Sequence, residues 1–108
     1  MDEREFERLA EEAMFRVERM LEANGIDFEW LPGRVLEIDC AEGGPVVIHR
    51  HLPSQELWVA SRSGGFHFWY DGAFWRDTRG GEDLFGLLSR LIRDRTGKLI
   101  VFNIPADS

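Results

Sequence analysis

Acidic side chains recur at helical spacing near the start of the chain, and they are the residues best suited to do chemistry. Glu3, Glu7 and Glu11 are four residues apart, and Glu18 and Glu22 continue the row two turns further along. Carboxylates at this spacing lie on one side of a helix. Their oxygen atoms suit hard cations such as iron, manganese, calcium or magnesium. With two acids of the strand that follows, the candidate metal ligands are Glu3, Glu7, Glu11, Glu18, Glu22, Asp27 and Glu29.

A solvated helix face explains the same row without any function. Each pair of like charges at this spacing costs only about 0.2–0.5 kcal/mol, and acids near the start of the helix gain from its dipole. Glu18 and Glu22 lie at the opposite end, where the dipole disfavours them. If the row binds a metal, it forms no closed cage, so we expect modest affinity and many retained waters. The same negative field could dock a basic protein surface, with binding weakened by salt.

A second candidate surface is aromatic. Trp58, His67 and Trp69 alternate with apolar residues, which predicts that they lie on the outer face of a sheet. Exposed tryptophans are typical anchors of protein interfaces, although a loop or a long side chain could instead cover them. The candidate partner-binding residues are Glu18, Glu22, Asp27, Trp58, His67 and Trp69.

The remaining residues give little support for a catalytic function. The sequence has no phosphate-binding loop, no His-Glu-x-x-His, no Cys-x-x-Cys and no nucleophile elbow. His49 and His51 lie on one strand face and make half of a metal site, but no further ligand is near in sequence. Cys40 alternates with Asp39 and is predicted to be buried, which argues against a reactive thiol. We expect no enzyme, and a ferroxidase or hydrolase using the two histidines is the minor alternative.

Length and charge limit the class of protein further. A chain of 108 residues has room for one domain, residues 1–108. The net charge is −7, and residues 1–29 hold ten acids against four arginines, so the acidity belongs to one end. Nucleic acid is therefore not expected as a partner. No apolar stretch could span a membrane, the first residues are unlike a signal peptide, and a single cysteine fits the cytoplasm.

The periodicity of apolar residues predicts the elements that position these groups. An apolar stripe at three- and four-residue spacing predicts a helix over residues 2–23, which ends at Asn24-Gly25, and a second helix covers about 82–94. Residues 99–102 form a last short strand or an extended tail. The predicted strands are 26–30, 36–40, 46–51, 56–61, 65–70 and 73–76. Short links favour antiparallel neighbours, so we expect an α+β two-layer sandwich with the N- and C-terminal helices on one face of the sheet.

The central segment resembles the most characteristic part of the frataxin family. Residues 48–69 read IHRHLPSQELWVASRSGGFHFW, and the Pro53 turn, Leu57–Ala60 and Gly64–Phe68 match the family pattern in order and spacing. The resemblance extends over nearly the whole chain and is to the bacterial, CyaY-type members. The chain departs from the family pattern at His49 and His51, where Asn and Gln are usual.

This resemblance implies a function as well as a fold. It implies iron binding by acids of the first helix and first strand, and partnership with the cysteine desulfurase and its iron–sulfur scaffold protein. The protein would be a regulator of cluster assembly and an iron donor, monomeric, with oligomers driven by iron. The alternative is a purely protein-binding modulator of the desulfurase, whose metal binding is incidental.

Overall fold

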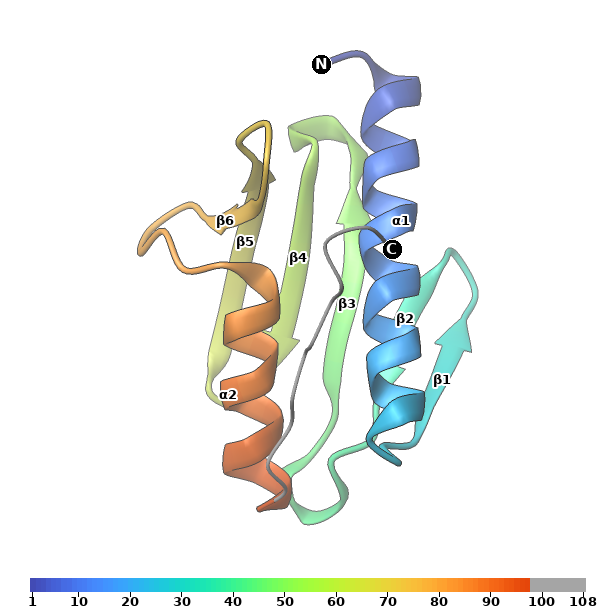
Figure 1. Cartoon of the computed structure of the whole chain (residues 1–108), viewed down its shortest axis with the longest axis vertical. Helices are drawn as coiled ribbons and strands as arrows, with labels where there is room; N and C mark the ends of the chain where they lie inside the picture. The colour runs from blue at the N-terminus through green and yellow to red at the C-terminus, as the bar shows by residue number, and fades with distance from the viewer. Residues whose placement is uncertain (98–108) are drawn as a thin grey trace.

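The computed structural model describes residues 1–97 and has two layers (Figure 1). Both helices cover one face of a six-stranded antiparallel sheet with the order β1-β2-β3-β4-β5-β6, which confirms the predicted fold class. The elements are α1 (Glu3–Ala23), β1 (Phe28–Leu31), β2 (Val35–Ile38), η1 (Ala41–Gly43), β3 (Val46–His51), η2 (Leu52–Ser54), β4 (Glu56–Ser61), β5 (Gly64–Tyr70), β6 (Trp75–Asp77) and α2 (Leu84–Thr96).

Helix α1 forms because its start, its stripe and its end all favour helix. Asp2 caps the first turn by accepting a hydrogen bond from the backbone N–H of Glu5 at 2.7 Å. The apolar stripe is buried, with Phe6, Val17 and Leu21 fully inaccessible to solvent. Gly25 ends the helix with a φ of 68°, a conformation that glycine adopts without strain. The acids of α1 are therefore kept off the face that packs on the sheet.

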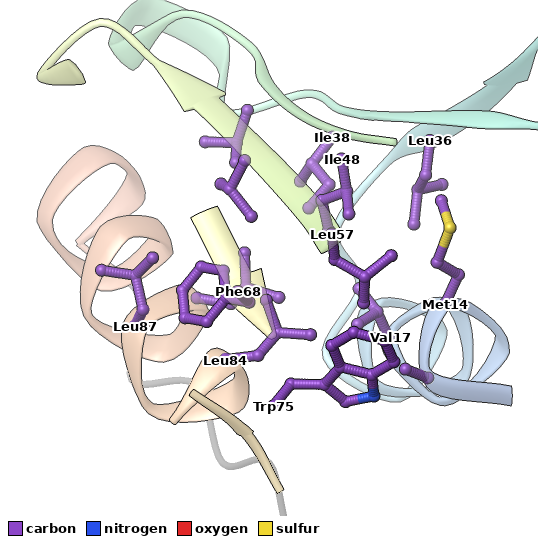
Figure 2. Packing of buried hydrophobic residues seen from close by; sticks show 14 of the residues in the cluster. Met14, Val17, Leu36, Ile38, Ile48, Leu57, Phe68, Trp75, Leu84 and Leu87 are labelled. Carbon is purple, nitrogen blue, oxygen red and sulfur yellow. The ribbon is translucent and has the colours of Figure 1, made fainter. Parts of the chain in front are cut away.

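The register of the sheet places apolar side chains on the helix-covered face. Ile48 on β3 is paired with Leu36 on β2 and with Val59 on β4, and Leu57 is paired with Phe68 on β5. All five are buried. Figure 2 shows such side chains of the sheet meeting those of both helices in one cluster. The opposite face of the sheet is left uncovered by any element within the described residues.

Two element boundaries differ from the predicted ones because local hydrogen bonds hold the backbone in another conformation. The second helix begins at Leu84, because Asp83 accepts hydrogen bonds from the backbone N–H groups of Phe85 and Gly86, at 3.1 and 3.2 Å. Strand β1 begins later than expected, since the N–H of Ile26 still bonds to the carbonyl of Leu21. The expected strand or tail at residues 99–102 lies outside the described residues. Neither described helix is long and apolar enough to cross a membrane.

The Asp83 cap gives a test of this account of α2. Replacing Asp83 with Ala should lower the free energy of unfolding by about 1 kcal/mol, because two N–H groups of the first turn lose their acceptor. Asp83→Asn is the matched control, since an amide oxygen can still cap, and it should lie close to the wild type. Urea unfolding measures both variants. Equal stability of the Ala and Asn variants would contradict the role of the cap.

Candidate functional site

The structure divides the acidic row of α1 into two parts, and the first part is paired with the protein's own arginines. Nη1 of Arg50, on β3, donates to Oε1 of Glu7 at 2.8 Å. Nη1 of Arg34, in the β1–β2 turn, donates to Oε2 of Glu11 at 3.1 Å. The Arg50 side chain is only 19% exposed, whereas that of Arg34 is 60% exposed. Glu7 and Glu11 are therefore partly neutralised, and Glu7 more firmly.

The second part of the row keeps its negative charge. Glu18 accepts a hydrogen bond from the indole Nε1 of Trp30 at 2.8 Å, which fixes the carboxylate without neutralising it. Within residues 1–97, Glu22, Asp27 and Glu29 make no ion pair, and all three are exposed. The carboxylates without a cationic partner in this range thus lie together where α1 ends and β1 begins. Glu3 is exposed at the other end of the helix, away from this group.

The β1–β2 hairpin adds two acids that sequence reasoning did not select. Glu37 is the register partner of Glu29, and the N–H of Asp39 donates to the carbonyl oxygen of Asp27 at 2.8 Å. The four carboxylates line one surface depression of about 330 Å³. The signal was available: Glu37 and Asp39 alternate with buried residues, so pairing across the Pro32-Gly33 turn had to place them beside the acids of β1.

This acidic surface is open, and the chemistry it allows follows from that. Among residues 1–97, no three His, Cys, Asp or Glu side chains are arranged so as to hold one metal ion. One or two carboxylates can bind a hard cation that keeps much of its water, as the weaker oxygen sites of proteins do. The residues therefore fit a weakly held, exchangeable cation and do not fit a permanent metal centre.

The aromatic candidates lie on the outer face of the sheet, as the alternation predicted. Trp58 is stacked between two imidazoles, with ring centroids 3.9 Å from His51 and 4.3 Å from His67. Its Nε1 donates to Oε1 of Glu56 at 2.8 Å. Both faces of the Trp58 ring are therefore covered by side chains, which was the alternative to an open anchor. Trp69 remains 47% exposed.

The three histidines hold the stack rather than forming a metal site. Nδ1 of His51 lies 2.7 Å from Oγ of Ser54, and Nδ1 of His49 lies 3.2 Å from the carbonyl oxygen of Arg50. His51 and His67 lie on opposite faces of Trp58, so their rings are kept apart. The half of a metal site that His49 and His51 offered as the minor alternative gains no third ligand among the described residues.

Cys40 is buried, as the alternation predicted, and its environment suppresses reactivity. The side chain is inaccessible to solvent. Burial raises the pKa of the Cys40 thiol above its usual value, and the nearby Arg95 offsets only part of this effect. A thiol that stays protonated is a poor nucleophile. Cys40 therefore belongs to the core and not to a functional site.

Comparison with known proteins identifies the family. The frataxin-like domain model matches residues 1–98. The chain is 48% identical over 103 residues to the iron–sulfur cluster assembly protein CyaY of Dechloromonas aromatica, covering 94% of this chain and 98% of that one. It is 36% identical over 101 residues to the protein of the same name from Neisseria meningitidis, covering 93% and 94%. The chain belongs to the frataxin family.

Solved structures agree with this assignment. Frataxin from Psychromonas ingrahamii superposes with a TM-score of 0.87 at 25% identity, covering 96% of this chain and all of that one. A ferrous complex of trimeric frataxin from the yeast Saccharomyces cerevisiae has the same fold, with a TM-score of 0.66 at 24% identity and coverage of 91% and 88%.

The two arginine pairs should differ in their contribution to stability. Arg50→Gln should lower the free energy of unfolding by about 1–2 kcal/mol, because a charge-assisted bond in a half-buried place is lost. Arg34→Gln removes the same charge from an exposed pair and should cost about 0.5 kcal/mol or less. Denaturant unfolding compares the two variants directly. Equal losses would mean that burial does not distinguish the pairs.

Proposed function

We propose that this protein binds ferrous iron weakly at surface carboxylates and acts in iron–sulfur cluster assembly. Its role would be to regulate the cysteine desulfurase–scaffold complex, with iron donation as a further contribution. The observation that carries the proposal is the uncompensated charge of Glu22, Asp27 and Glu29, which make no ion pair within residues 1–97. The name of the CyaY relatives supports the pathway, and the ferrous complex of the yeast frataxin supports the metal.

The iron would be cargo rather than a resident cofactor. Hard carboxylate oxygens suit it, and an open surface lets it exchange. The pairing pattern ranks the ligands: Glu7 and Glu11 must first leave their arginines, so they would contribute least. The proposed metal-binding residues are Glu3, Glu7, Glu11, Glu18, Glu22, Asp27 and Glu29, joined by Glu37 and Asp39.

The acidic surface where α1 ends and β1 begins would also be the docking edge, which binds a basic surface of the desulfurase. Glu18, Glu22 and Asp27 provide the negative charge, while the outer sheet face provides apolar contact through Trp58, His67 and Trp69. Because both faces of Trp58 are covered, its contribution would be a flat, rigid platform, and Trp69 would be the exposed contact. We propose a monomeric, single-domain, cytoplasmic protein that performs no catalysis itself and forms oligomers only with iron.

A second function is favoured by a specific observation. Two acids of the row are already paired, and residues 1–97 hold no metal cage. Both facts suit a modulator whose carboxylates serve only to dock the desulfurase, with iron binding incidental. The two functions differ in one measurable property, which is iron affinity at the acidic edge.

An anaerobic titration of the ¹⁵N-labelled protein with ferrous iron tests the iron proposal. Signals of residues 22–29 and 37–39 should broaden first, because the uncompensated carboxylates lie there. Asp27→Asn/Glu29→Gln should weaken binding about tenfold, equivalent to about 1.4 kcal/mol. The control Glu7→Gln/Glu11→Gln removes the same charge from paired positions and should change affinity much less. An unchanged spectrum up to millimolar iron would leave only the docking function.

Binding to the cognate desulfurase, measured at low and at physiological ionic strength, tests the docking proposal. Affinity should fall with salt, and Glu18→Lys/Glu22→Lys should slow association by about tenfold or more, because the steering field is reversed. The control Glu5→Lys/Glu12→Lys makes the same change in net charge on a different stripe of α1. An equal decrease of the association rate in both variants would mean that only net charge matters, which would contradict a defined docking edge.

A further inference from the structure

An exposed aromatic residue interrupts the acidic row of α1. Glu11, Phe15, Glu18 and Glu22 follow one another at spacings of four, three and four residues, which places them on one face of the helix. Phe15 lies outside the buried stripe and is 43% exposed. A large apolar side chain between carboxylates costs solvation and adds nothing to the core. It therefore needs another explanation.

Phe15 forms one wall of a groove between α1 and β1. Its ring makes an edge-to-face contact with Trp30, with centroids 5.9 Å apart and an interplanar angle of 68°. Met14 and Leu31 complete the apolar lining of a groove of about 320 Å³. Trp30 is held in place by its hydrogen bond to Glu18, so this wall is rigid. The groove is therefore preformed, and one carboxylate of the row, Glu11, lies in its lining.

The polar residues of the groove indicate the chemistry of its occupant. Glu11, Arg34 and Arg50 line it, but Arg34 is paired with Glu11 and Arg50 with Glu7, so neither arginine needs an anion from outside. Glu18 borders the groove through Trp30 and has no cationic partner within the described residues. Glu22 continues the row from there. An occupant that complements this arrangement is apolar where it enters the groove and basic where it meets these acids.

We propose that the groove between Phe15 and Trp30 receives one bulky apolar side chain of a partner segment whose neighbouring residues are basic. The inference rests on the proposed docking function and names the partner chemistry at that edge. Exposed charge pairs contribute little affinity by themselves, whereas an apolar anchor in a preformed pocket contributes much more. The carboxylates steer the partner, and the groove retains it.

The test compares variants of Phe15 in binding to the cognate desulfurase. Phe15→Ala should weaken binding about tenfold, as expected for loss of an interface anchor, with the salt dependence unchanged. Phe15→Leu should recover most of the affinity, because the wall stays apolar. Phe74→Ala is the matched control, since Phe74 is also a large exposed aromatic, 53% exposed in the β5–β6 turn, and it should bind like the wild type. Thermal unfolding of each variant verifies the fold.

A second measurement uses the unmodified protein. Two acetylated peptides, Lys-Arg-Leu-Arg-Lys and Lys-Arg-Ala-Arg-Lys, differ only in the central apolar residue. The Leu peptide should shift the ¹⁵N and side-chain signals of Met14, Phe15, Trp30 and Leu31 at lower concentration than the Ala peptide. Equal shifts by both peptides would show that charge alone acts, and would overturn the proposal.

Other outcomes separate this inference from the docking function. If Phe15→Ala binds like the wild type while Glu18→Lys/Glu22→Lys binds more weakly, the proposal for the groove is wrong and the proposed docking function is retained. Wild-type affinity in both variants overturns the docking function itself. If octanoate fills the groove at lower concentration than the Leu peptide, the occupant is a small amphipathic anion. If the protein alone forms a dimer that Phe15→Ala dissociates, the occupant is a second copy. Either result overturns the proposal.

Discussion

Burial of the apolar stripe of α1 against the sheet fixes the direction of every acid on that helix. Phe6, Val17 and Leu21 are inaccessible to solvent, so the helix cannot rotate without exposing them. The carboxylates at the remaining positions must then face water or the edge of the sheet. The acidic row of α1 therefore follows from core packing and needs no dedicated element to create it. This coupling explains how a chain of 108 residues can hold many like charges together and remain folded.

The protein's own cations decide which of these charges remain available. Arg50 and Arg34 connect β3 and the β1–β2 turn to the first half of α1, so they stabilise the contact between the layers while neutralising Glu7 and Glu11. The second half of α1 receives a neutral donor instead, the indole of Trp30. The carboxylates that make no ion pair within residues 1–97 therefore gather where α1, β1 and β2 meet. Under the proposed function, a cation and a basic protein surface would compete for the same place, which would couple iron loading to partner binding.

The outer face of the sheet follows a different rule. Its central tryptophan is enclosed by imidazoles and held by a carboxylate, so the ring has one orientation. Rigid aromatic surface loses little conformational entropy on binding. His51 stacks on one side of this ring, and His49 makes an edge-to-face contact with it. Both histidines also make polar contacts through Nδ1, so aromatic packing and hydrogen bonding act together around the Trp58 ring.

The sequence by itself determined the elements, their faces and the fold class. The three- and four-residue spacing of α1 and the alternation around Leu57 and Val59 are local patterns, and burial follows from them directly. The same patterns placed Trp58, His67 and Trp69 on the outer face and Cys40 in the core. Pairing across the β1–β2 turn also lay within reach, since a short hairpin fixes which residues face each other.

Only the tertiary structure decided which carboxylates are free. Glu7 and Arg50 are 43 residues apart in the chain, and Glu18 and Trp30 are 12 apart. No periodicity relates such residues, because their distance depends on how the helix layer sits on the sheet. The enclosure of Trp58 and the groove beside Phe15 arise in the same way, from side chains that belong to different elements. Local periodicity records which way a side chain points, whereas what it meets there depends on the packing of the whole chain.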